Sequence, residues 1–283
     1  MRYSLIVVVS GFLATVSGHG LITSIQGANG VTMPGLSVAD GVPRDCITPT
    51  CGAEADTSII RDRELGTSKA SALGRTQGAG PVDASTVIAA FMGEGAASGN
   101  ATEKKRSSFS ARGFLDSLTG GSDSQGTKSE AATETIVAAS AGQGATSGLP
   151  TCADDGSITM TFRQINQDGA GPLSADVDGT SGGTDPDAFQ TAEVTQDVPG
   201  LPIGGLSAAT NTNFPVTVQM PAGMTCDATV GNTPNVCVVR VRNAALAGPF
   251  GGSAAFTQSS AAKKRAVAYR LKKRSAEQNR TVR

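Results

Sequence analysis

The sequence predicts a mainly β protein that folds as an antiparallel β-sandwich. Three runs alternate apolar and polar residues, at 157–165, 214–220 and 236–242, and such alternation is typical of a strand with one buried and one solvated face. The connections between the runs are long and rich in Gly and Asp, and no succession of strands and helices indicates a parallel α/β sheet. The expected fold is an immunoglobulin/fibronectin-like sandwich with long loops and a low-complexity insertion.

The composition is typical of an extracellular β protein with a modest core. The chain of 283 residues contains 36 Gly and 13 Pro, no Trp, and only 4% aromatic residues. Small side chains each bury little apolar area, so disulfides are expected to contribute to stability. The scarcity of aromatic side chains for base stacking also argues against nucleic acid as a partner.

The first 18 residues have the pattern of a secretory signal peptide. Arg2 precedes an apolar run that begins at Leu5, and the small residues Ser17 and Gly18 close the segment. The apolar run is far shorter than the roughly 20 residues that cross a bilayer, so no membrane anchor is expected. We expect a secreted, extracellular protein whose mature chain begins at His19; cleavage after Ser17 would instead place this histidine one residue inside.

The remaining chain divides into a body, an insertion and a tail. Residues 19–260 are expected to form the sandwich domain, interrupted at about 93–148 by an exposed, partly disordered insertion with a short helix at 131–141. Residues 261–283 carry nine Lys or Arg against one Glu, a net +8, which leaves −9 for the rest of a chain whose total is −1. The basic tail is interpreted as a solvated or cleaved segment, or as one that binds anionic cell-wall material.

Five cysteines follow the signal peptide, and an oxidising compartment is expected to pair four of them. Cys226 and Cys237 flank a turn-rich stretch and are predicted to form a disulfide. Cys46 and Cys51 could bridge each other, or either could reach Cys152. Zinc is not predicted, because no second cysteine pair or histidine pair completes four ligands.

Five sequence blocks occur in order along the mature chain, at residues 19–30, 44–46, 55–64, 164–172 and 237–252. Together they resemble the fungal appressorium-associated virulence factors, the powdery-mildew Egh-type and MAS-type secreted proteins. The resemblance covers nearly all of the mature chain except the insertion and the extreme tail. It implies a protein secreted during spore germination or host penetration, with cell-wall polysaccharide or the host surface as its partner.

A second resemblance lies inside the first. A signal peptide that ends directly before His19, the dipeptide at 171–172 and the Gly-rich run at 247–252 are similar to lytic polysaccharide monooxygenases and their copper-binding, non-oxidative relatives. In that superfamily the amine and imidazole of the first residue chelate copper on a flat face of a β-sandwich, and a second histidine completes a T-shaped site. The resemblance therefore implies copper held by His19, with an open position for oxygen or a co-substrate.

The chain departs from this pattern because His19 is its only histidine. Asp168 lies just before the Gly-Pro dipeptide, where the second ligand of such proteins tends to fall, and is the candidate carboxylate ligand. The alternative for Asp168 is a turn residue, since Asp-Gly favours tight turns. Phe250 could lie below the metal as an axial apolar group or serve as a core residue. The missing nitrogen ligand weakens the case for a redox enzyme but leaves copper binding open.

Three functions are considered on these grounds. The favoured one is a secreted virulence-associated factor that acts at the cell wall or host surface during infection-structure formation and binds copper through His19. The first alternative is a lytic polysaccharide monooxygenase-like copper enzyme that oxidises chitin or glucan. The second is an acidic-site hydrolase, for which the carboxylates are abundant but lack a diagnostic spacing: Asp154, Asp155, Asp168, Asp176, Asp178, Asp185 and Asp187.

Overall fold

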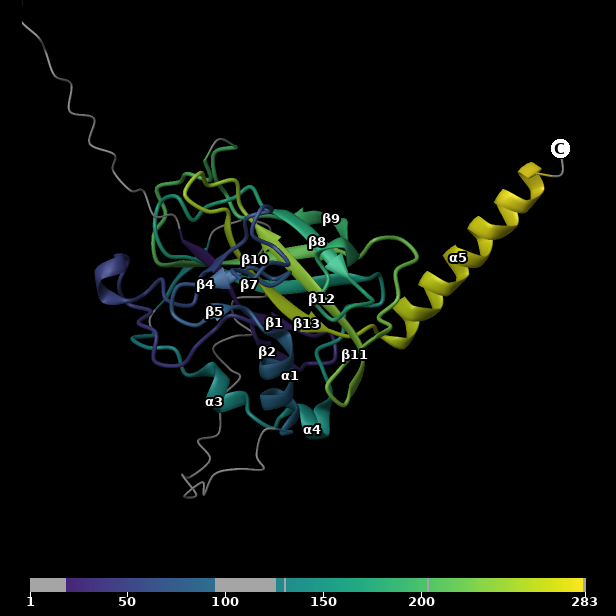
Figure 1. Cartoon of the computed structure of the whole chain (residues 1–283), viewed down its shortest axis with the longest axis horizontal. Coiled ribbons are helices and arrows are strands. Elements are labelled where there is room, and N and C mark those ends of the chain that lie inside the picture. Colours follow the sequence, from purple (N-terminus) through teal and green to yellow (C-terminus); the bar gives the residue numbers. More distant parts are fainter. Residues whose placement is uncertain (1–18, 95–125, 130, 203, 282–283) are drawn as a thin grey trace, which may run out of the picture.

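The computed structural model describes residues 19–94, 126–129, 131–202 and 204–281. The predicted signal peptide and residues 95–125 of the predicted insertion lie outside the described residues. Figure 1 shows a β-rich body, short helices gathered along its lower edge and one long helix that projects from it.

Most of the body is built from short and medium-length strands. They are β1 (Gly20–Gln26), β2 (Thr32–Pro34), β3 (Ser58–Ile59), β4 (Arg75–Thr76), β5 (Gly80–Pro81), β6 (Thr127–Lys128), β7 (Ser157–Gln164), β8 (Ser174–Asp178), β9 (Phe189–Gln196), β10 (Thr212–Gln219), β11 (Ala228–Val230), β12 (Thr233–Arg242) and β13 (Phe250–Phe256). The three predicted strands are confirmed as β7, β10 and β12. Every pairing between these named strands is antiparallel.

The strands form one continuous curled sheet. Its order is β2-β1-β7-β10-β9-β8-β12-β13-β3-β4-β5, with β6 added to β10 and β11 added to β12. Strand β9 joins the two halves, because it pairs with β10 on one side and with β8 on the other. The mainly antiparallel β class is therefore confirmed, whereas the immunoglobulin/fibronectin-like sandwich is not, because the two halves belong to one sheet.

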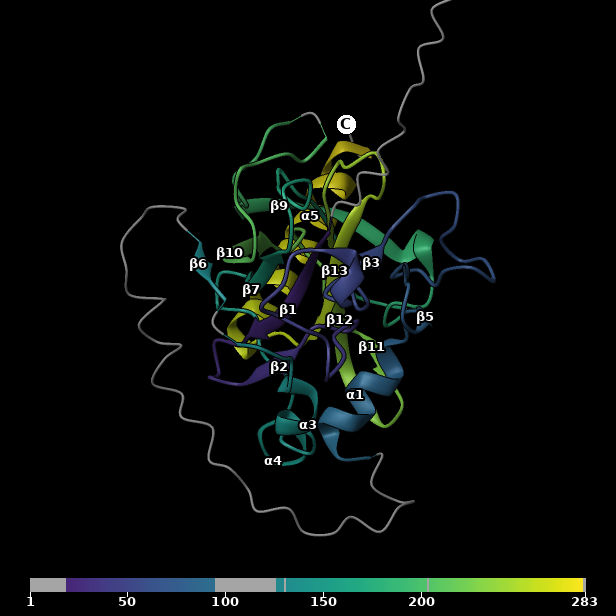
Figure 2. The same cartoon turned by 90° about the vertical axis from the view of Figure 1, so that its left-hand side faces the viewer.

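The curl brings the two halves together around the core. Strand β1 runs beside β7 and packs against β13, as Figure 2 shows. The backbones approach so closely that a Cβ on Gly252 would lie 2.6 Å from the amide nitrogen of Ile22. Only glycine fits such an approach. The main core fills the space between the halves with fully buried side chains that include Ile22, Phe162, Val216, Val239 and Phe256.

Pro215 lies inside β10, where a missing N–H would ordinarily break a ladder. On one side β10 pairs with β7 along its whole length, with Pro215 opposite Thr161. On the other side β6 pairs only as far as Asn213, and β9 begins to pair at Thr217. The proline thus falls in the gap between two partners.

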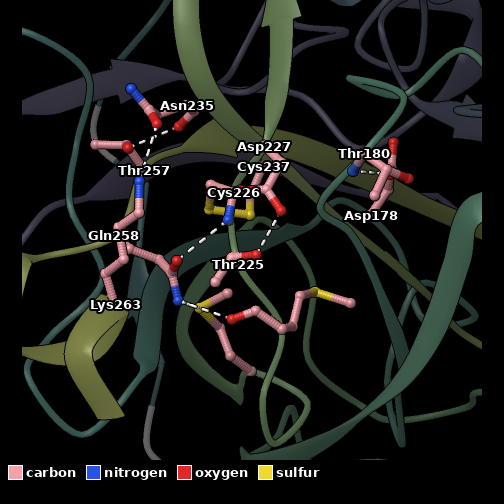
Figure 3. Close-up of a disulfide and its surroundings, with 12 residues drawn as sticks. Asp178, Thr180, Thr225, Cys226, Asp227, Asn235, Cys237, Thr257, Gln258 and Lys263 are labelled. Atoms are coloured by element: carbon pink, nitrogen blue, oxygen red, sulfur yellow. Dashed lines mark hydrogen bonds between the residues drawn. A yellow bond between two sulfur atoms is a disulfide. The ribbon is translucent and has the colours of Figure 1, made fainter. Parts of the chain in front are cut away.

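Both disulfides join neighbouring parts of the chain. Cys226 and Cys237 are bonded as predicted, and Cys46 bonds to Cys51, which leaves Cys152 as a buried thiol. In Figure 3, Gln258 lies beside the Cys226–Cys237 bridge, where its side chain accepts a hydrogen bond from the Cys226 amide at 3.1 Å and donates one to the carbonyl of Met224 at 3.0 Å. The bridge is thereby tied to the segment that follows β13.

Helices α1 (Ala84–Met92), α3 (Ile136–Ser140) and α4 (Gly144–Ser147) cover the lower edge of the body in Figure 1. Two short 3-10 turns, Pro49–Cys51 and Pro186–Ala188, lie elsewhere in the chain. Asp83 caps α1 by accepting a hydrogen bond from the Ser85 amide, and Gly93 ends it in the left-handed conformation. Helix α3 lies within the predicted short helix. The part of the predicted insertion that is described therefore packs on the body through α4, whose Gly144 lies against Phe91.

The basic tail forms α5 (Ser260–Thr281). Ser259 lies just before it and accepts a hydrogen bond from the Ala262 amide at 3.1 Å, as an N-cap residue does. Among the residues the structure describes, no helix combines the length and the apolar character needed to cross a bilayer.

Candidate functional site at His19

His19 directly precedes β1 and is fixed by the end of β7. Its carbonyl accepts a hydrogen bond from the Ile165 amide at 2.9 Å, and its own backbone nitrogen donates to Oδ1 of Asn166 at 2.9 Å. The backbone of His19 is therefore held at both its polar groups by consecutive residues of one turn.

The imidazole of His19 meets the carboxylate of Glu54. The Nε2 atom lies 3.1 Å from Oε2 of Glu54, and the side chains are only 1% and 4% exposed. The other carboxylate oxygen of Glu54 accepts a hydrogen bond from Nδ2 of Asn166 at 3.2 Å. One asparagine thus links the backbone of His19 to the carboxylate that its ring contacts.

Arg44 anchors the loop that carries Glu54. Its guanidinium donates from Nη1 to Oδ1 of Asp56 at 3.0 Å and from Nε to Oε2 of Glu134 at 3.0 Å. Arg44 and Asp56 are both buried. A charged pair held by several hydrogen bonds gives this loop a fixed position relative to the sheet.

Phe250 packs against the ring of His19. The two ring centroids lie 4.5 Å apart with 27° between the planes. Phe250 also belongs to a small buried cluster with Ile59 and Ala245. Phe250 is therefore a core residue that also covers one face of the histidine, and an axial position below a metal stays a prediction.

Asp168 lies at the same end of the sheet. It is 5% exposed, and burial raises the pKa of its carboxyl above the usual range. The pKa of Glu54 rises to about 7, chiefly through burial and then through the negative charge of Asp168. Glu54, which contacts the imidazole, and Asp168 are therefore two interacting buried carboxylates at this end of the sheet.

The turn that carries Asp168 is shaped by its glycine. The Gly169 amide donates to the Asn166 carbonyl at 3.1 Å, and a Cβ on Gly169 would lie 2.0 Å from the carbonyl oxygen of His19. Asp168 is therefore a turn residue as well as a neighbour of the histidine. The structure brings together the two residues that the sequence singled out, His19 and Asp168.

Asn243 connects this turn to the loop before β13. Its buried Nδ2 atom donates to the carbonyls of Asp168 at 3.1 Å and Ala170 at 3.2 Å. Its Oδ1 atom accepts from the amides of Ala245 at 3.2 Å and Phe250 at 3.0 Å. One side chain thereby fixes the positions of both Asp168 and Phe250.

Two of the other carboxylates considered for a hydrolase, Asp178 and Asp176, have structural contacts. Asp178 accepts hydrogen bonds from the amides of Thr180, Ser181 and Gly183, which hold its pKa below the usual range against the opposing effect of burial. Asp176 pairs with Arg240 at 2.9 Å. These residues stabilise turns and strands rather than sharing a pocket with His19.

The donor set is compatible with copper. Within the described part of the chain, no three side chains of His, Cys, Asp or Glu form a ready-made metal centre. The third donor of a histidine brace, however, is a terminal amine rather than a side chain. An N-terminal His19 offers that amine and its Nδ1 as a chelate, which leaves Nε2 to the Glu54 contact, and Asp168 supplies a nearby carboxylate.

Glu54 and Asn166 are the site residues that sequence reasoning missed. Asn166 lies in the same short stretch as Asp168, and its position two residues after the end of β7 is the one signal that could have indicated it. Glu54 lies in a loop after Cys51, and no periodicity or motif connects it to His19.

Comparison with known proteins gives consistent matches. The model of the family described as Egh16-like virulence factor matches residues 17–251. The chain is 57% identical over 280 residues to the appressoria-specific virulence factor GAS2 of Pyricularia oryzae, which spans 97% of this chain and 95% of that protein. It is 36% identical over 148 residues to the appressoria-specific virulence factor GAS1 of the same fungus, across 51% and 55% of the two chains. No solved structure matches.

Proposed function

Because the chain belongs to the Egh16-like virulence factor family, we propose that it is secreted, acts at the cell wall or host surface during infection-structure formation, and binds copper through His19 after the signal peptide is removed. The family match and the near full-length similarity to a protein named as appressoria-specific support the first part. The observation that carries the second part is the 3.1 Å contact between the buried His19 imidazole and Glu54 beside Asp168.

Each residue has a defined part in this proposal. His19 would hold the ion through its terminal amine and Nδ1, and Asp168 would supply a carboxylate. Glu54 would orient the ring by accepting a hydrogen bond from Nε2–H, which is the usual role of a carboxylate behind a metal-binding histidine. Phe250 covers one face of the ring and keeps water from it. Bound copper would supply a Lewis acid at this position.

The proposal concerns binding rather than oxidation. His19 is the only histidine in the chain, so no second imidazole completes the T-shaped set that the oxidative enzymes use. A carboxylate in its place is a harder donor, which lowers the affinity for Cu(I) relative to Cu(II). Oxidation of chitin or glucan is worth assaying only if copper binding is found.

The test is a copper(II) titration of the secreted, correctly processed protein, in which binding is measured by calorimetry and by electron paramagnetic resonance. A version with one extra N-terminal residue is the decisive comparison, because it removes the terminal amine from His19 and leaves every side chain in place. We expect binding that is lost on extension and weakened about tenfold by Asp168→Asn, with Asp187→Asn, at an exposed carboxylate, as the matched control. Weak copper binding that is the same with and without the extra N-terminal residue would refute the copper proposal.

The proposed role at the cell wall or host surface is tested in a separate experiment. Labelled processed protein is incubated with isolated fungal and plant cell walls, washed at physiological salt and compared with a secreted control protein of similar size and net charge. Retention above that control is expected, and equal retention would contradict a role at the wall.

A further inference from the structure

Helix α5 concentrates the positive charge of this acidic protein. Residues 261–283 carry a net +8 while the rest of the chain carries −9. A helix of 22 residues is about 33 Å long, and Figure 1 shows that it projects from the body rather than lying along it. We call α5 the cationic arm.

The base of the arm is firmly attached. Ala262 and Ala266 are buried against the body, and Arg265 donates to the carbonyl of Asp154 at 3.1 Å. Lys263 donates to Oδ1 of Asn235 at 3.2 Å, a contact drawn in Figure 3 beside the Cys226–Cys237 disulfide. The first turns are thus docked on a disulfide-closed loop, which fixes the direction in which the rest of the arm leaves the body.

Beyond these turns most of the arm is exposed, although Tyr269 still lies against Gly223 of the body. From Val267 to Asn279 every side chain is exposed. The basic residues do not all share one face, because successive residues of an α-helix are about 100° apart. Arg270 and Arg274 lie one turn apart on one face, whereas Lys272 lies on the opposite face. A helix with so little apolar surface beyond its first turns is solvated rather than part of the core.

The charge distribution selects the class of partner. A helix that binds a membrane surface needs a long continuous apolar face. The exposed apolar residues Val267 and Leu271 lie one turn apart, but no large apolar residue follows Leu271 within α5. Sequence-tolerant binding of single-stranded nucleic acid uses aromatic platforms, and Tyr269 is the one aromatic residue of α5. A flexible polyanion needs only distributed point charges, which the arm supplies on every side.

We propose that the cationic arm docks the protein onto a polysaccharide that bears carboxylates. The acidic body repels such a polymer, so contact is confined to the arm. The family match ends at residue 251, before α5 begins at Ser260, so the arm adds to the domain that the family model covers. This inference deepens the cell-surface part of the proposed function and is independent of its copper part.

The experiment measures binding of the intact processed protein to polygalacturonate by calorimetry at several salt concentrations. The test variant is Lys273→Gln with Arg274→Gln, and the matched control is Arg63→Gln with Lys69→Gln, two exposed basic residues of the body. Glutamine favours helix about as well as lysine, so circular dichroism should show α5 unchanged. We expect the arm variant to bind about fivefold more weakly with a shallower salt dependence, and the control variant to bind like the parent.

Equal loss in both double variants would overturn the proposal, because it would indicate a general charge effect. Tighter binding to anionic phospholipid vesicles or to DNA than to polygalacturonate would also overturn it, as would an intact mass showing that secretion removes α5. The protein could also be retained on isolated walls without binding polygalacturonate. That result would refute the role of the arm but leave the proposed function supported.

Discussion

Nε2 of His19 lies 3.1 Å from Oε2 of Glu54, and both side chains are almost fully buried. This contact ties His19 to a loop that is fixed by Arg44, while Phe250 covers the ring. The orientation of the histidine is therefore set by the protein before any ion binds.

Removing the carboxylate that orients the ring should weaken copper binding. Glu54→Gln keeps the size of the side chain but no longer holds the ring through a charged acceptor, and the affinity for copper(II) is expected to fall about tenfold in calorimetry at pH 7. Glu64→Gln, which alters a carboxylate paired with Arg61 and Arg75, is the control. An unchanged affinity for Glu54→Gln would show that the ring does not depend on this contact.

The same variant should change how stability depends on pH in metal-free protein. The pKa of Glu54 is about 7 in the folded protein and about 4.3 in an unfolded chain. The folded state thus binds the proton more tightly, so this group's contribution is full below the unfolded value and is lost as pH rises through 7. Relative to the parent, Glu54→Gln should gain free energy of unfolding between pH 5 and 8, by at most about 3 kcal/mol.

Urea denaturation with a chelator present, repeated across that pH range, checks this expectation. Near pH 4 the parent carries a protonated Glu54 in both states, so the two proteins should differ least there. A difference in stability that stays constant from pH 5 to 8 would be inconsistent with the raised pKa.

Asn243 should be a strong determinant of stability. Asn243→Ala removes four hydrogen bonds and leaves the buried carbonyls of Asp168 and Ala170 without this donor, at a cost of about 2–4 kcal/mol. Asn243→Asp retains the acceptor for the amides of Ala245 and Phe250 but loses the donor. The parent should have the highest midpoint of thermal unfolding. A midpoint for Asn243→Ala equal to that of the parent would contradict this account.

The two disulfides should contribute unequally. Cys226 and Cys237 are 11 residues apart, and replacing both by Ala should cost about 3 kcal/mol on chain entropy alone. Cys46 and Cys51 are 5 residues apart, so the same change there should cost about 2 kcal/mol. Loss of the first bridge should also loosen the base of α5, because Gln258 hydrogen-bonds to Cys226. Hydrogen exchange at the start of α5 measures that second effect.

The sequence predicted the strands that alternate and missed the one that joins the sheet. Residues of β7 and β10 point alternately into the core and outward, so their pattern is visible in the chain. Strand β9 has only Ala192 fully buried, so it carries no apolar alternation, and the continuity of the curled sheet could not be inferred.

The site was predictable where local sequence determined it. His19 was indicated by the end of the signal-peptide pattern, and Asp168 by its place before a Gly-Pro dipeptide. The proximity of Glu54 arises only from the tertiary fold, because the Cys46–Cys51 turn and the ion pair of Arg44 with Asp56 place its loop at the start of β1. Copper binding itself stays a prediction.

The position of β1 has a kinetic consequence. Strand β1 pairs with β7, where Gly20 lies opposite Gln164, and it packs against β13, which ends at Phe256. Contacts of such large sequence separation slow folding. A chain that is synthesised from its N-terminus therefore cannot complete the sheet until nearly all of it has been made. During that interval β1 has an unpaired edge, and such an edge favours aggregation of the incomplete chain.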